Sequence, residues 1–324
     1  MPANLPPQYF EVEKSFRSAK TAQEKIVALE EMLAIMPKHK GTDHLRAELR
    51  SRIAKLTELA SKKSGAHRAS MVIQKEGAAQ VAVIGLPNVG KSQLVSSITN
   101  ASPDVADYPF TTHTATPGMM EFENIQIQLI DTPPLVPRSI EFWLPHLLRR
   151  ADALLVLVDL SDAPLTQMET ITAQLEKMRI GIGTGKTEDE VIISQKKALI
   201  IGNKLDLDNA RKSYAALENK YIHQLPVTAI SAKEGIGLEE LKLSIYQMLN
   251  IIRVYTKTPG QKPDLNDPII LERGSKVEDA VVAVHKDFVA RLKYARVWGS
   301  GKHDGIMVKR DHILQDGDII ELHV

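Results

Sequence analysis

The chain of 324 residues is long enough for two or three domains with a sizeable core. Its 41 basic and 40 acidic residues nearly cancel, which excludes a global field that attracts a polyanion, so any basic surface must be local. The absence of cysteine excludes disulfides, thiolate zinc sites and cysteine nucleophiles, and it suits a reducing compartment.

The N-terminal segment, residues 1–76, is expected to form a helical hairpin followed by a linker. Apolar residues recur at helical spacing over 7–63, and Pro37 and Gly41 interrupt the pattern. The second arm is basic, and two interpretations stay open: a solvated outer face or an RNA-binding face. The first residues lack the basic start and apolar run of a secretory signal, so we expect a cytoplasmic protein.

Residues 77–250 alternate apolar strands with helices. Strands are expected at 81–84, 125–130, 153–158, 198–201 and 226–230. The continuous apolar run at 153–158 is typical of a parallel sheet covered on both faces, and it is too short to span a membrane. The pattern predicts an α/β domain with a mostly parallel sheet, which binds ligands beyond the carboxyl ends of its strands.

A phosphate-binding loop follows the first of these strands. Gly85-Leu-Pro-Asn-Val-Gly-Lys-Ser92 fits the pattern G-x-x-x-x-G-K-[ST], in which backbone N–H groups and a helix N-terminus surround phosphates. Lys91 is expected to reach the β- and γ-phosphates, and the Ser92 hydroxyl to bind Mg²⁺. The predicted nucleotide-binding residues here are Gly85, Pro87, Asn88, Val89, Gly90, Lys91, Ser92 and Gln93.

Two further segments are predicted to complete the magnesium and γ-phosphate site. Asp131 ends the second strand and is placed to hold Mg²⁺ through a water. Thr111 and Thr112 lie before that strand, and either could close over the γ-phosphate and complete the metal shell. Our predicted catalytic residues are therefore Lys91, Thr111, Thr112 and Asp131, with Ser92, Thr112 and Asp131 as metal ligands.

The segment Asn203-Lys-Leu-Asp206 indicates a preference for guanine. One carboxylate, Asp206, can accept both the N1–H and the N2 amino group of guanine, whereas adenine would leave it unpaired. Asn203 can bond N7 and brace the loops, and the Lys204 stem can lie over the ring. Ser231-Ala-Lys233 follows another strand, and the Ala232 N–H can donate to guanine O6.

The last segment, residues 251–324, shows a different pattern. Short strands at 253–256, 268–271, 294–298 and 318–322 surround one helix, expected at 277–288. This order predicts a small α+β domain with a β-grasp fold.

These motifs together resemble the Obg-related translation-factor GTPases, and within them the developmentally regulated GTP-binding (DRG) proteins. The residues that carry the resemblance are the phosphate loop, Asp107-Tyr-Pro-Phe-Thr-Thr112, Asn203–Asp206 and, for a C-terminal TGS domain, Tyr255–Gly260, Tyr294–Gly299 and Asp316–Asp318. The resemblance implies a GTP/GDP switch that acts on ribosomes, ribosomal RNA or tRNA, with a possible regulatory protein on the TGS domain. No DNA or membrane partner is expected.

The chain departs from the DRG pattern in two places. Pro134 replaces the glycine of Asp-x-x-Gly and has no N–H for the γ-phosphate. An insertion that DRG proteins carry between the second switch and the guanine motif is also missing. These departures favour a prokaryotic relative.

Hydrolysis is predicted to be slow. Leu135 occupies the position at which Ras-like enzymes carry the glutamine that orients water. Asn88 matches the asparagine that binds K⁺ in potassium-activated relatives, so we expect Mg²⁺-dependent hydrolysis that K⁺ stimulates. Two alternatives stay open: a GTP-binding scaffold with little or no hydrolysis, and an ATPase, which the intact Asn203–Asp206 motif disfavours.

Overall fold

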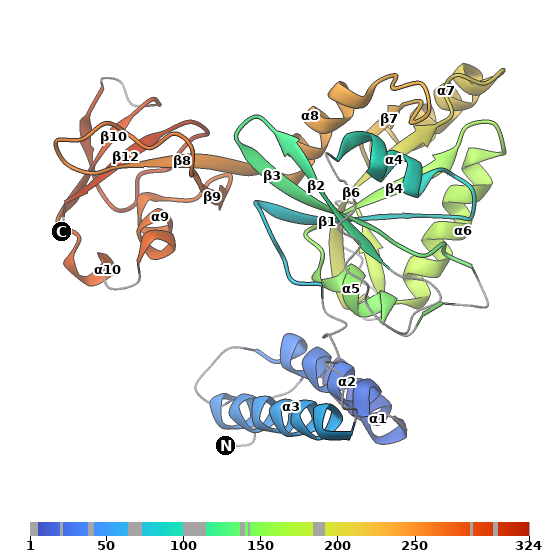
Figure 1. The fold of residues 1–324 in the computed structure, drawn as a ribbon, viewed down its shortest axis with the longest axis horizontal. Helices are drawn as coiled ribbons and strands as arrows, with labels where there is room; N and C mark the ends of the chain where they lie inside the picture. The colour runs from blue at the N-terminus through green and yellow to red at the C-terminus, as the bar shows by residue number, and fades with distance from the viewer. Residues whose placement is uncertain are drawn as a thin grey trace.

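The structure is a computed structural model of the whole chain (Figure 1). It describes residues 6–19, 22–37, 42–63, 73–99, 115–136, 140–141, 143–183, 192–285, 288–300 and 304–323. No helix in these ranges is both long enough and apolar enough to cross a bilayer.

A twisted sheet of seven strands forms the centre of the α/β domain, in the order β2-β3-β1-β4-β6-β5, with β7 also paired to β6. All pairs are parallel except β2 with β3. The strands are β1 (Ala79–Gly85), β2 (Thr116–Phe122), β3 (Ile125–Asp131), β4 (Ala153–Asp159), β5 (Ile180–Ile182), β6 (Ser194–Asn203) and β7 (Val227–Ala229). The five predicted strands of this domain are confirmed, and β2 and β5 are additional.

Helices cover both faces of the sheet, as the continuous apolar strands predict. The helices are α4 (Lys91–Ile98), α5 (Leu144–Arg150), α6 (Pro164–Lys177), α7 (Ala210–Tyr221) and α8 (Leu238–Leu249). Side chains of β1 alternate between the two apolar cores: Ala82 and Ile84 pack with α5, α6 and α7, whereas Val81 and Val83 pack with α4 and α8. This two-sided burial fixes the strand ends that carry the nucleotide motifs.

The N-terminal helices form a separate layer beside α5. Helices α2 (Ala22–Ile35) and α3 (Asp43–Lys63) form the expected hairpin, and a further helix, α1 (Pro7–Ser18), packs on α2 through Tyr9 and Val12. The layer is held to the α/β domain by the ion pairs of Glu31 with Arg149 (3.0 Å) and of Glu11 with Arg179, and His146 Nε2 lies 3.3 Å from Glu30.

The C-terminal unit is a five-stranded sheet in the order β11-β10-β12-β8-β9. Its elements are β8 (Ile251–Lys257), β9 (Ile269–Glu272), α9 (Val277–Val284), α10 (Phe288–Arg291), β10 (Tyr294–Trp298), β11 (Ile306–Val308) and β12 (Ile319–His323). The parallel pair β8–β12 lies in the middle, and α9 packs on one face, as in a β-grasp fold. The helix expected over 277–288 was too long, because α9 ends at Val284 and His285 is extended.

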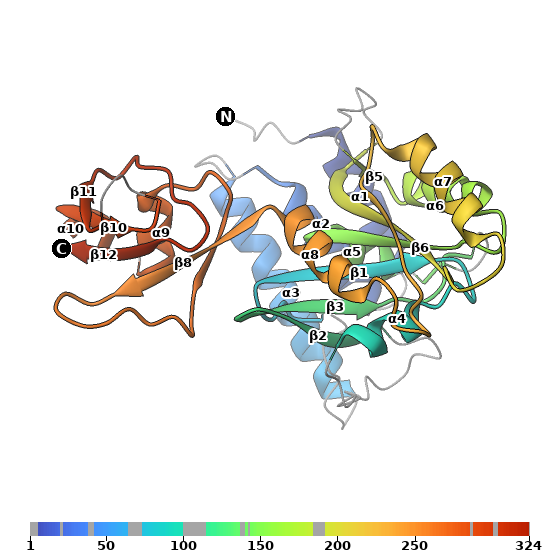
Figure 2. The same cartoon turned by 90° about the horizontal axis from the view of Figure 1, so that it is seen from above.

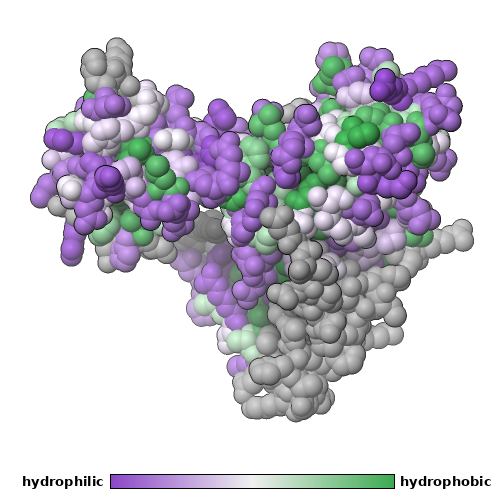
Figure 3. Space-filling model, turned by 45° about the horizontal axis from the view of Figure 1, so that its top comes forward, coloured by the Kyte–Doolittle hydropathy of each residue, from purple (hydrophilic) through white to green (hydrophobic). Residues whose placement is uncertain are grey.

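The two sheets are joined closely. β8 begins one residue after α8, and the turn between β2 and β3 reaches the C-terminal unit (Figures 1 and 2). Figure 3 shows the α/β domain and the C-terminal unit side by side. Hydrophilic residues cover much of the visible face, and smaller hydrophobic areas lie among them.

Candidate guanine-nucleotide site

The phosphate-binding loop lies between β1 and α4, where its backbone must turn tightly. Asn88 and Gly90 both have positive φ, 63° and 95°. A Cβ at Gly90 would meet the Asn203 side chain at 2.4 Å, and one at Gly85 would meet the Leu157 carbonyl at 2.5 Å. Close approach therefore requires both glycines, and at Gly90 the positive φ is a second reason.

The Lys91 side chain is turned back onto the loop. Its ammonium group donates to the carbonyls of Leu86 (3.1 Å) and Gly85 (3.4 Å), and the residue is buried. Burial lowers the pKa of Lys91, an effect that the nearby Asp131 opposes. An ammonium group in this position is available for phosphate oxygens at the N-terminus of α4.

The two described residues expected to hold magnesium lie in direct contact. Ser92 Oγ donates to Asp131 Oδ2 at 2.5 Å, although the residues are 39 positions apart. The other oxygen, Asp131 Oδ1, is buried and has no partner among the described residues. Burial raises the pKa of Asp131, while the Ser92 hydrogen bond and Lys91 act against that rise. A hydroxyl and an unsatisfied carboxylate oxygen form a donor set that suits Mg²⁺.

The Asn203 side chain joins the phosphate loop to the Ser231–Lys233 loop. Its Nδ2 donates to the Val89 carbonyl (2.8 Å), and its Oδ1 accepts the Ala232 N–H (3.0 Å). The expectation that Asn203 braces the loops is thus seen directly. The Ala232 N–H, which we expect to donate to guanine O6, donates to Asn203 Oδ1 in this structure, because this buried amide oxygen needs a donor.

The Asp206 carboxylate lies at the exposed edge of this brace. Ser231 Oγ donates to Asp206 Oδ1 at 2.5 Å and accepts the Glu234 N–H at 3.1 Å. The Ser231 hydrogen bond is the main cause that lowers the pKa of Asp206. Asp206 is therefore ionised at neutral pH and can accept two donors from one base edge.

Comparison with known proteins also indicates a GTP-binding protein. A model described as a 50S ribosome-binding GTPase matches residues 80–197, and a TGS domain model matches residues 252–324. An uncharacterized GTP-binding protein of Methanocaldococcus jannaschii is 32% identical over 366 aligned positions, which cover 93% of this chain and 92% of that one. The chain belongs to this family of GTP-binding proteins.

Other members of the family carry more specific names. Ribosome-interacting GTPase 1 of Saccharomyces cerevisiae is 26% identical, with 93% of this chain and 99% of that one covered. A developmentally-regulated GTP-binding protein 2 homolog of Dictyostelium discoideum is 29% identical, with 92% and 98% covered. The alignments extend over more positions than the 324 residues of this chain, so these relatives contain internal residues that it lacks.

A solved structure supports the fold. The YchF GTPase of Schizosaccharomyces pombe superposes with a TM-score of 0.53 at 13% identity, which covers 78% of this chain and 100% of that chain. At this identity the likeness concerns the fold alone: a P-loop GTPase domain with a parallel-dominated sheet and a TGS domain.

Sequence reasoning missed Asp159, which ends β4 beside the guanine motif of this GTPase domain. Lys204 Nζ contacts Asp159 Oδ2 at 2.5 Å, and Ser161 donates to Asp159 Oδ1 from both its hydroxyl and its backbone. The pKa of Asp159 is lowered by these partners, although burial acts in the opposite direction and is the largest single cause. Its position could have identified it, because Asp159 is the polar residue that ends an otherwise apolar strand.

The remaining predicted residues lie around the site with less definite roles. Pro87 and Asn88 are exposed in the phosphate loop, Val89 is buried, and Gln93 directs its amide to Ser97 Oγ (3.3 Å). Lys233 is exposed and pairs with Glu234. Thr111 and Thr112 lie outside the described residues.

Leu135, at the position of the catalytic glutamine, lies in the hydrophobic core. The Leu135 side chain is fully buried in the core, and its backbone N–H donates to the Gly85 carbonyl at 3.0 Å. Leu135 therefore contributes packing and a backbone link to the phosphate loop, and its side chain has no polar group to orient water.

Proposed function

We propose that this GTPase-family protein binds GTP and GDP with Mg²⁺, hydrolyses GTP slowly, and acts as a nucleotide-controlled switch on ribosomes or translation-associated RNA in the cytoplasm. We also propose that the protein belongs to the DRG-type branch and comes from a prokaryote. Its three parts would be a helical hairpin with a linker (residues 1–76), the GTPase domain (77–250) and the TGS domain (251–324). The single observation that carries the proposal is the exposed Asp206 carboxylate, held by the Ser231 hydroxyl beside the Asn203 brace.

The magnesium assignment is supported by the contact between Ser92 and Asp131 and by the buried Asp131 Oδ1, which no described residue partners. Mg²⁺ would neutralise charge on the β- and γ-phosphates, while Lys91 would leave the loop carbonyls for phosphate oxygens. Potassium is proposed at Asn88, which is exposed in the phosphate loop. The ribosomal role is supported by the name of the yeast relative, and the TGS domain is the proposed contact for RNA or a regulatory protein.

Titration calorimetry with Mg²⁺ tests the nucleotide assignment. We expect heat from GTP and GDP and at least about 100-fold weaker binding of ATP, since adenine leaves the carboxylate unpaired. Equal affinity for GTP and ATP would refute guanine recognition.

A second candidate function, a GTP-binding scaffold with little or no hydrolysis, is favoured by the buried Leu135 and by Pro134. Single-turnover phosphate release in matched K⁺ and Na⁺ buffers, with and without ribosomes, separates the two functions. The switch predicts release that K⁺ or ribosomes accelerate and co-sedimentation with ribosomes that depends on the nucleotide. The scaffold would be supported if the protein bound ribosomes equally with every nucleotide and released no phosphate.

A further inference from the structure

The β2–β3 hairpin extends from the candidate magnesium site to the TGS domain. Seven consecutive residue pairs join its strands, from Thr116 opposite Asp131 to Phe122 opposite Ile125. A seven-residue strand is about 23 Å long, so the hairpin spans much of the domain. One end carries Asp131, which contacts Ser92, and the other end carries the turn Glu123–Asn124.

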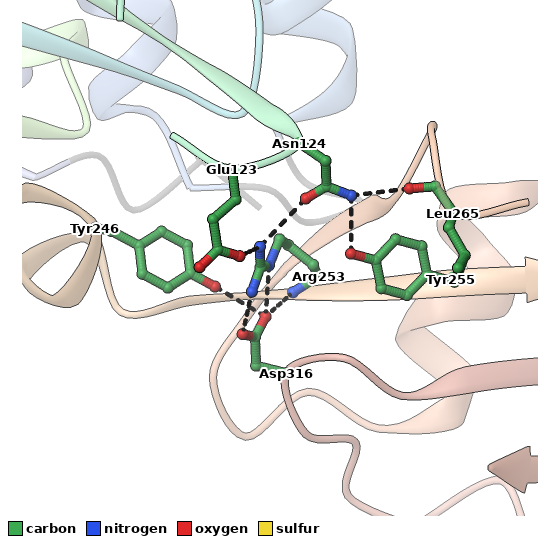
Figure 4. Close-up of polar contacts among 7 residues, drawn as sticks. All are labelled: Glu123, Asn124, Tyr246, Arg253, Tyr255, Leu265 and Asp316. Carbon is green, nitrogen blue, oxygen red and sulfur yellow. Dashed lines mark hydrogen bonds and ion pairs between the residues drawn. The ribbon is translucent and has the colours of Figure 1, made fainter. Parts of the chain in front are cut away.

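That turn is held by the TGS domain (Figure 4). Asn124 Nδ2 donates to the Tyr255 hydroxyl (2.8 Å) and to the Leu265 carbonyl (2.9 Å), and its Oδ1 accepts from Arg253 (3.2 Å). Glu123 forms an ion pair with the same arginine. The hairpin tip thus engages both β8 and the loop that follows it.

Arg253 is the centre of this contact. Its Nη2 and Nε bond the two oxygens of Asp316 at 2.8 and 3.1 Å, while Nη1 faces the hairpin. The guanidinium lies over the Tyr246 ring of α8 at 5.4 Å, and the side chain is only 11% exposed. An arginine that is largely covered and bound to both domains resists separation, because loss of one partner leaves part of its charge unpaired.

Aromatic packing adds a third connection. Phe122, the last residue of β2, stacks on Tyr246 with ring centroids 4.8 Å apart, and the Tyr246 hydroxyl donates to Asp316 at 2.8 Å. The hairpin tip, the last helix of the GTPase domain and the TGS turn at Asp316 therefore form one cluster. We call Glu123, Asn124, Tyr246, Arg253 and Asp316 the interdomain clamp.

The covalent connection between the domains is a single residue. Asn250 separates α8 from β8 and adopts a left-handed conformation with φ of 54°. A connection this short leaves the orientation of the TGS domain to non-covalent contacts, which begin with Ile251 and Ile270 at the GTPase-domain core. The clamp supplies a second point of attachment, on an element that ends at Asp131.

We infer that the β2–β3 hairpin couples the nucleotide site to the TGS domain: the occupied γ-phosphate and magnesium site displaces the hairpin, and the clamp converts this displacement into rotation of the TGS domain about Asn250. Arg253, Glu123 and Asn124 are positioning residues, which act on the nucleotide site only through the hairpin. The inference rests on the proposed switch function, because a protein that does not bind GTP has no such signal to transmit.

Double electron–electron resonance measures this rotation in the full-length protein. The chain has no cysteine, so spin labels would attach only to cysteines that are introduced. We choose Ala173→Cys in α6 and Met307→Cys in β11, because both positions are exposed. Neither residue belongs to the clamp or the nucleotide motifs. We expect the distance distribution with GDP to differ from that with a non-hydrolysable GTP analogue and Mg²⁺.

The clamp is tested with Glu123→Ala combined with Asn124→Ala, in the same labelled background. The matched control is Glu121→Ala, an exposed carboxylate on the same hairpin. The clamp variant should give one broad distribution with either nucleotide, and the control should keep the shift. The milder Asn124→Ser variant should show a partial effect if the double variant unfolds.

Calorimetry supplies a readout that a purely structural role would not change. Coupling between two sites is reciprocal, so loss of the clamp should change the ratio of GTP-analogue to GDP affinity by about fivefold or more. A structural defect would weaken the binding of both nucleotides equally and leave the ratio of their affinities unchanged. Glu121→Ala should leave both affinities unchanged.

The outcomes separate the two proposals. Absence of GTP binding refutes the proposed function itself. Guanine-specific binding with identical distance distributions for both nucleotides overturns the coupling alone, as does a clamp variant that keeps both the shift and the affinity ratio.

Discussion

The base end of the nucleotide site, around Asn203 and Ser231, differs from the phosphate end, around Lys91 and Asp131. At the base end the protein satisfies its own polar groups, since both polar atoms of the Asn203 side chain are paired and Ser231 holds Asp206. At the phosphate end Lys91 rests on loop carbonyls, and Asp131 Oδ1 has no partner in the part of the chain that the structure describes. The difference indicates that guanine would meet a preformed surface, whereas the proposed phosphate and Mg²⁺ would relieve charges that burial makes unfavourable.

The largest expected effect is at Asp206. Asp206→Asn replaces a carboxylate acceptor with an amide, so two charge-assisted bonds to guanine are lost and GTP affinity should fall on the order of 1,000-fold. Xanthosine triphosphate, with a carbonyl at C2, should gain affinity. Because Asp206 is exposed, the melting temperature should stay within about 2 °C.

Calorimetry with both nucleotides checks this prediction, and Asp208→Asn, an exposed aspartate two residues away, is its control. An unchanged preference for guanine would show that the base is read elsewhere, and it would remove the distinction between the two ends.

The next effect combines affinity and stability. Asn203→Ala removes two buried hydrogen bonds and leaves the Val89 carbonyl and the Ala232 N–H unpaired, which should lower the free energy of unfolding by about 2–4 kcal/mol. GTP affinity should fall about tenfold or more as the two loops separate. Denaturant unfolding and calorimetry measure the two effects, with Gln224→Ala, an exposed turn residue, as the control. A loss of affinity at unchanged stability would contradict the idea of a preformed base end.

The sequence predicted the strands and the motif order because both depend on local patterns. The apolar segments that form β1, β3, β4, β6 and β7 have a local pattern typical of strands, and each motif begins at or just after the end of a strand. The interdomain clamp was not predictable in this way, because Arg253 and Glu123 are 130 positions apart. The ion pair between Lys204 and Asp159 was not predictable either. We expected the Lys204 stem to lie over the base, but its ammonium group binds the carboxylate that ends β4.

Asp131→Asn should separate stability from function at the phosphate end. Burial raises the pKa of Asp131, so its contribution to stability is present below its ordinary pKa and is lost as the pH rises through the raised value. At neutral pH the ionised group destabilises the free protein, and the amide should raise the melting temperature by about 2–4 °C, equivalent to about 1 kcal/mol. The effect of Mg²⁺ on GTP affinity should disappear.

Scanning calorimetry of the nucleotide-free and magnesium-free protein at low and neutral pH tests this sign. The gain should be larger at neutral pH than below the ordinary pKa of a carboxyl group, and Asp208→Asn should show no gain at either. A lower melting temperature at neutral pH would mean that the Ser92 and Lys91 contacts outweigh burial.

The smallest effect is expected at Lys233, the third residue of the Ser-Ala-Lys motif. Its side chain is 80% exposed and its partner Glu234 is 49% exposed, with the ion pair at 3.1 Å. Exposed pairs of this kind contribute little, so Lys233→Ala should change the free energy of unfolding by less than about 0.5 kcal/mol and GTP affinity by less than about twofold. The motif would then act through the Ser231 hydroxyl and the Ala232 backbone, which the substitution leaves in place. A tenfold loss of affinity in calorimetry, at unchanged stability, would instead place the Lys233 stem against the nucleotide, and part of the base end would be ordered only when the base is bound.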